Sequence, residues 1–97
     1  MKGYYTVKLV GGDLPNTERI ALETRYVRSL EALLGGGERV RDLCLRAATA
    51  MRSGSAALLG DDLTSACAQA EAAAWADRVR AGGARFSLSA WSADDLP

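Results

Sequence analysis

Two strand-like segments, one near each end of this 97-residue chain, are separated by a middle that shows only helical patterning. Residues 4–10 and 85–91 alternate apolar and polar side chains, as half-buried β-strands do. The intervening residues 11–84 are rich in Ala, Leu and Arg. Because two strands alone make a marginal sheet, we expect the fold to need a partner that completes it.

Three helices are predicted between the strands. They cover about residues 17–34, 38–52 and 61–81, and the first and third end at glycine clusters. The core-facing arc of the first helix comprises Ile20, Leu22, Tyr26, Val27, Leu30, Leu33 and Leu34. With 18 Ala and 13 Leu against five Val and one Ile, the core is expected to consist mainly of close-packed helices.

The order of the elements predicts an α+β fold, β-α-α-α-β, in which a small sheet of the two terminal strands packs under a three-helix layer. If successive elements alternate in direction, the terminal strands are parallel. Because a parallel pair is seldom left open, dimerisation is expected to complete the sheet. The length predicts one domain over residues 1–97, with residues 92–97 as a frayed acidic tail.

Trp75 supplies most of the bulk of the third predicted helix, on a face that it shares with Val79, Ala68 and Ala72. The opposite apolar face consists of Leu63, Cys67, Ala70 and Ala74. A helix that is apolar on two sides is expected to lie between other elements. We therefore predict that Trp75 packs against the sheet and that the Cys67 face packs against the second helix.

Strand alternation also defines a candidate interaction surface. The inward set is Tyr5, Val7, Leu9, Phe86, Leu88 and Ala90. The outward set is Tyr4, Thr6, Lys8, Val10, Arg85, Ser87, Ser89 and Trp91. Our candidate interaction surface is six of these residues: Tyr4, Thr6, Lys8, Arg85, Ser87 and Trp91. Aromatic residues and Arg are enriched in protein interfaces, so this face is predicted to bind a partner protein. The alternative is that the C-terminal tail or residues 56–59 cover it.

A second hypothesis is a small-molecule pocket between sheet and helices. Arg19 and Glu23 are polar residues within the apolar arc, and their i, i+4 spacing predicts a salt bridge at the rim of the core. The pocket hypothesis uses the set Tyr5, Arg19, Glu23, Tyr26 and Trp75.

A weaker third hypothesis is a nucleic-acid-associated regulator. The formal net charge is zero, although residues 1–52 hold nine of the twelve Lys and Arg residues and six of the twelve Asp and Glu residues. The outward strip that would carry this function is Arg25, Arg28, Arg39 and Arg46. Because acidic residues interleave with it, nucleic acid is not the expected partner.

The residue inventory argues against catalysis and against metal binding. The chain has no histidine, so Ser and Cys nucleophiles lack their usual base. Cys44 and Cys67 lack the paired spacing of a zinc site and are predicted to be buried free thiols. Residues 11–12 form a glycine turn without a phosphate-binding motif. We expect no catalytic residues, no metal and no cofactor.

These patterns favour a non-catalytic protein-interaction or regulatory module. It is expected to be homodimeric and to bind an unidentified protein partner through its sheet face or edge. Residues 1–3 lead directly into a strand without a signal peptide, and no apolar run approaches the ~20 residues that span a bilayer. The expected location is therefore the cytoplasm, with no membrane contact.

Overall fold

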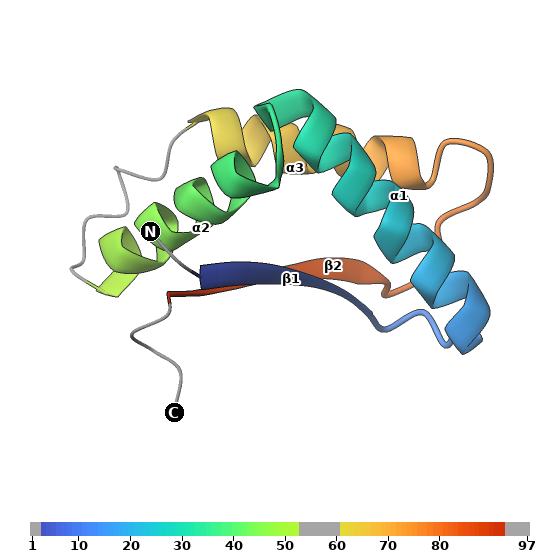
Figure 1. Ribbon diagram of the computed structural model, residues 1–97. Helices are drawn as coiled ribbons and strands as arrows, with labels where there is room; N and C mark the ends of the chain where they lie inside the picture. Colours follow the sequence, from blue (N-terminus) through green and yellow to red (C-terminus); the bar gives the residue numbers. More distant parts are fainter. Residues whose placement is uncertain (1–2, 53–60, 93–97) are drawn as a thin grey trace.

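The computed structural model describes the backbone of residues 3–52 and 61–92 and the side chains of residues 5–46 and 62–90. Its elements are β1 (Gly3–Val10), α1 (Asn16–Leu34), α2 (Gly37–Arg52), α3 (Asp61–Ala74) and β2 (Arg85–Ser92). This order confirms the predicted α+β fold. All three helices lie on one face of the sheet, as Figure 1 shows. The predicted acidic tail beyond Ser92 and the apolar segment at residues 56–59 lie outside the described residues.

The two strands form an antiparallel sheet whose register runs from Gly3 opposite Ser92 to Val10 opposite Arg85. The expectation of parallel strands was wrong because α1 and α2 do not reverse direction. Figure 1 shows them as the two sides of an arch that crosses the sheet once, after which α3 returns. Gly35 ends α1 in the left-handed conformation with φ 91°, so the chain bends between the two helices without forming an antiparallel hairpin.

The buried side of α1 is narrower than the predicted arc. Leu22, Tyr26 and Leu30 are buried, whereas Ile20 is 61% exposed and Leu33 is 46% exposed. The exposed pair lies near the two ends of α1, Ile20 toward its start and Leu33 toward its end, whereas the buried residues occupy the middle of the helix.

Helix α3 ends at Ala74, earlier than predicted, and residues 75–78 form turns. The prediction that Trp75 packs against the sheet is confirmed, because Trp75 is buried and its ring centroid lies 6.3 Å from that of Phe86. The prediction of two apolar faces was wrong, since Val79 is 90% exposed. Once the helix has ended, Trp75 and Val79 no longer share a face.

Two clusters of apolar side chains make the core, and Phe86 packs against both. The Tyr26 cluster consists of Tyr26, Leu30, Val40, Cys44, Ala66, Ala70 and Ala74. The Trp75 cluster consists of Leu9, Leu22, Trp75 and Ala84. Cys67 packs on the Tyr26 cluster, which joins α1, α2 and α3. Helix α3 lies mainly on α1 and only lightly on α2, so the predicted α2 partner for the Cys67 face is a minor one.

Candidate functional site: the uncovered sheet face

The outer sheet face comprises the described side chains that point away from the helices, which are Thr6, Lys8, Val10, Arg85, Ser87 and Ser89. In the register, Thr6 lies opposite Ser89, Lys8 opposite Ser87 and Val10 opposite Arg85. Among the described elements, no helix covers this face (Figure 1). Tyr4 lies opposite Trp91 at the far end of the sheet, and both side chains lie outside the described set.

The outer sheet face is positively charged and rich in hydroxyl groups. Lys8 and Arg85 are exposed, and no strand side chain between residues 5–10 or 85–90 is acidic. Because Lys8 lies opposite Ser87, Arg85 is its diagonal cross-strand neighbour. Diagonal neighbours lie about 7–8 Å apart, so this face holds two cations close together. Within the described side chains, neither cation forms an ion pair.

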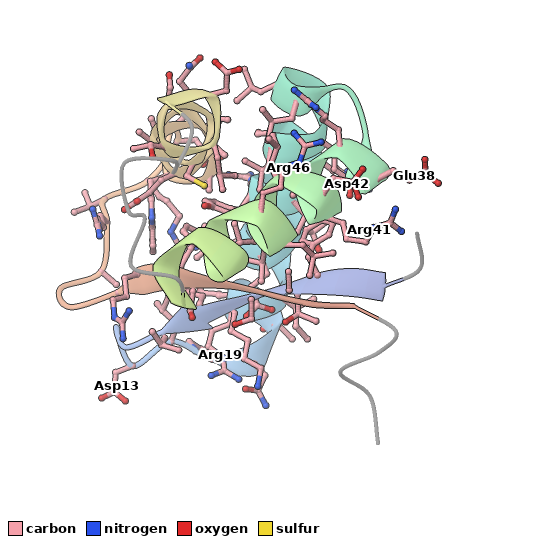
Figure 2. All side chains as sticks on the ribbon, turned by 90° about the vertical axis from the view of Figure 1, so that its left-hand side faces the viewer. Asp13, Arg19, Glu38, Arg41, Asp42 and Arg46 are labelled. Atoms are coloured by element: carbon pink, nitrogen blue, oxygen red, sulfur yellow. The ribbon has the colours of Figure 1, made fainter. Side chains whose placement is uncertain are left out.

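Side chains beyond the strands add charges of both signs at one end of the sheet. Figure 2 shows Asp13 and Arg19 on the side of the sheet away from α2. Both residues are exposed, and Arg19 donates a hydrogen bond to Asn16 over 3.0 Å. Their opposite charges balance, so the positive excess on this side comes from the outer sheet face.

The two edges of the sheet differ. The Leu9 backbone N–H donates to Glu23 Oε2 over 2.8 Å, so a carboxylate from α1 closes the β1 edge at that position. This bond replaces the predicted Arg19–Glu23 salt bridge, which the described side chains do not form. Helix spacing pointed to a partner on the same helix, but the packing of α1 beside β1 offers Glu23 a backbone donor.

Of the residues in the pocket hypothesis, Tyr5 packs on the Tyr26 cluster, whereas Arg19 is exposed at the start of α1. Tyr5 donates a hydrogen bond from its hydroxyl to Glu31. Burial, with that carboxylate beside it, raises the pKa of Tyr5 above its ordinary value. Tyr26 stacks on Phe86 with ring centroids 4.2 Å apart, and Trp75 belongs to the other cluster.

Among the described side chains, clefts are found elsewhere on the surface. One, of about 370 Å³, is lined by residues of α1, α2 and α3 that include Leu33, Arg39 and Gln69. Another, of about 350 Å³, lies between α1 and the turn after α3, where Arg25 pairs with Asp77 at 2.5 Å and Arg78 pairs with Glu18 at 3.2 Å. Their linings include none of the five predicted pocket residues.

The cysteines are both free, as predicted. Cys44 is buried, and burial raises the pKa of its thiol to about 11. Cys67 is only partly buried, which corrects the expectation that both thiols are enclosed. Burial also raises the pKa of Tyr26, whose hydroxyl lies beside Cys67. The thiols therefore lie against a tyrosine in the Tyr26 cluster.

The predicted arginine strip is broken up by acidic groups. Arg25 forms a bidentate pair with Asp77, which takes it out of the strip. Figure 2 shows Arg41 and Arg46 on α2 together with Glu38 and Asp42. This mixture of signs gives α2 no continuous basic surface.

None of the described helices is long and apolar enough to cross a membrane. The side chains placed by the structure include no group of three or more His, Cys, Asp or Glu residues that could hold a metal ion. Comparison with protein-family models, curated proteins and solved structures gives no match. The functional argument therefore rests on the chain's own surfaces.

Proposed function

We propose that this chain is a non-catalytic, cytoplasmic protein-interaction module whose outer sheet face binds an acidic, extended segment of a partner protein. The observation that carries the proposal is the pair of exposed cations, Lys8 and Arg85, on a face that the described helices leave uncovered. Free cysteines are typical of reducing compartments and support the cytoplasmic location.

The spacing of the two cations suits a peptide in an extended conformation. Diagonal cross-strand neighbours lie about 7–8 Å apart. Alternate residues of an extended chain lie about 7 Å apart, since each residue adds about 3.4 Å. Two acidic residues separated by one other residue therefore match Lys8 and Arg85. The hydroxyls of Thr6, Ser87 and Ser89 add donors and acceptors around them.

Electrostatics favours an acidic partner over a neutral one. Like charges held close together on one sheet face repel each other, and an anionic ligand relieves this repulsion. The interaction takes place on an exposed surface, so binding is expected to weaken as the salt concentration rises.

The test is fluorescence anisotropy with a labelled peptide that alternates Glu and Ser. Lys8→Glu and Arg85→Glu are each expected to weaken binding by roughly three- to tenfold, because each change replaces an attraction by a repulsion. The matched control is Arg28→Glu, which makes the same change in net charge at an exposed position on α1.

Equal losses for Arg28→Glu and Lys8→Glu would show that net charge alone governs binding, and would contradict the proposal. A single-stranded oligonucleotide that binds more tightly than the acidic peptide would contradict it as well, in favour of nucleic acid. No such preference is expected, because the face lacks the strongly basic character of nucleic-acid sites.

A further inference from the structure

The edge of β2 presents unpaired backbone groups. Because the Leu9 N–H donates to Glu23, it points away from β2, and the Leu9–Phe86 pair is not hydrogen-bonded across the sheet. In antiparallel sheets such pairs alternate with hydrogen-bonded ones. Phe86, Leu88 and Ala90 therefore direct their N–H and C=O groups toward the outer edge of β2.

Between residues 86 and 90, the described part of this edge lacks the features that usually prevent strands from pairing between molecules. Residues 86–90 contain no charged residue and no proline. Arg80 donates to the Ala84 carbonyl just before β2, but within the described set no side-chain hydrogen bond reaches Phe86, Leu88 or Ala90. Glu23, by contrast, closes the β1 edge within the strand, at Leu9. The β2 edge is therefore the edge available for pairing with another strand.

We propose that a second copy of this chain occupies the β2 edge. The two β2 strands pair antiparallel about a two-fold axis at Leu88, and the result is a four-stranded sheet in the order β1-β2-β2-β1. This inference rests on the sheet edge and does not depend on the proposed acidic ligand of the sheet face.

The register is self-complementary. With Leu88 on the axis, Phe86 lies opposite Ala90 of the second copy, so a large side chain meets a small one on the helix-covered face. All these residues direct their backbone groups to the paired edge, so the pairing forms about six hydrogen bonds. Ser87 lies opposite Ser89 of the second copy on the outer face.

Charge supports the same register. Arg85 is the only charged residue in β2, and this register places it opposite Trp91 of the second copy, far from its own symmetry mate. No like charges are therefore brought together across the axis. Pairing also joins the two outer sheet faces into one continuous surface.

The first measurement is sedimentation equilibrium at micromolar concentration. The expected mass is about 20 kDa, twice the 10.2 kDa of one chain. Ala90→Pro removes an N–H that points to the free edge and no hydrogen bond to β1, so it is expected to give a folded monomer, with folding checked by circular dichroism. A wild-type monomer would overturn the inference, and so would an Ala90→Pro variant that is folded and still dimeric.

The second measurement tests the register by disulfide cross-linking. Ser87 and Ser89 of the second copy form a non-hydrogen-bonded pair, whose Cα atoms lie about 4.5 Å apart, within disulfide range. A mixture of Ser87→Cys and Ser89→Cys chains is expected to form the mixed disulfide under mild oxidation. Ser87→Cys alone is not expected to cross-link, because its symmetry mate is a diagonal neighbour about 7–8 Å away. The wild-type chain controls for Cys44 and Cys67.

Cross-linking of Ser87→Cys alone, without the mixed product, would overturn the proposed register. The two proposals fail separately. A monomer that still binds the acidic peptide would overturn the dimer and leave the proposed function standing. A dimer that does not bind the peptide would contradict the proposed function and leave the dimer standing.

Discussion

The two faces of this one sheet differ in how firmly neighbouring elements fix their side chains. On the covered face, Phe86 stacks on Tyr26 at 4.2 Å and lies 6.3 Å from Trp75, while the Tyr5 hydroxyl donates to Glu31. On the outer face, Lys8 and Arg85 are exposed. Residues of the same strands therefore contribute to stability on one side and remain available for binding on the other.

The largest expected effect tests the covered face at Trp75. Trp75→Ala is expected to lower the free energy of unfolding by about 3–5 kcal/mol, because a buried aromatic side chain is replaced by a cavity. This is a large share of the ~5–15 kcal/mol that stabilises a typical domain. Urea unfolding followed by circular dichroism measures the loss. Val79→Ala is the control, since Val79 is 90% exposed and its loss is expected to stay within about 0.5 kcal/mol.

Similar losses for Trp75→Ala and Val79→Ala would contradict the view that contacts on the covered face contribute most to stability. They would show that the Trp75 cluster does not hold the sheet against α3.

An intermediate effect is expected at Gly11, where the sheet turns toward α1. Gly11 has φ +77°, and a Cβ there would lie 2.3 Å from the Gly83 carbonyl oxygen. Gly11→Ala is therefore expected to cost at least about 2 kcal/mol, from the left-handed conformation and the clash together. Thermal and urea unfolding measure it. Gly82→Ala is the control, because a Cβ at Gly82 meets nothing within 4 Å.

A stability loss at Gly82 as large as that at Gly11 would contradict this view of the turn. The close approach of the two loops would then have no special role in joining the sheet to the helices.

The smallest expected effect concerns the Cys44 thiol. Burial raises its pKa from 9.0 to about 11, so the folded state keeps the proton that the unfolded chain releases. This contribution to stability is complete below pH 9 and is lost as the pH rises from about 9 to 11. In a Cys67→Ser variant at pH 8, alkylation of Cys44 is expected to be at least about tenfold slower than in the urea-unfolded chain. Equal rates in the two states would contradict the burial of this thiol.

Local patterns predicted much of the fold. A period of two defines both strands and both faces, and the glycines after Leu34 mark the end of α1, because these signals depend on neighbouring residues. The end of α3 could not be predicted from neighbouring residues. Trp75 packs on Phe86, and Asp77 pairs with Arg25, so contacts with distant residues end the helix at Ala74.

The residues of the candidate site could be predicted from the sequence, but the pairing and the edges of the strands that carry them could not. Alternation alone placed Lys8 and Arg85 on one face. The difference between the two edges required knowing that Glu23 reaches the Leu9 N–H, a contact between side chain and backbone that no spacing rule reports. The antiparallel direction likewise depended on the bend at Gly35, which a glycine cluster indicates only as the end of a helix.

The strand register has a consequence for how the chain is made. It joins Gly3 to Ser92, so the sheet closes a loop that spans most of the 97 residues. A ribosome adds about 5–20 residues per second, so several seconds pass between the synthesis of β1 and the synthesis of β2. Contacts this distant in sequence also slow the search for the native pairing. Strand β1 is therefore paired only after the three helices that cover it have been synthesised.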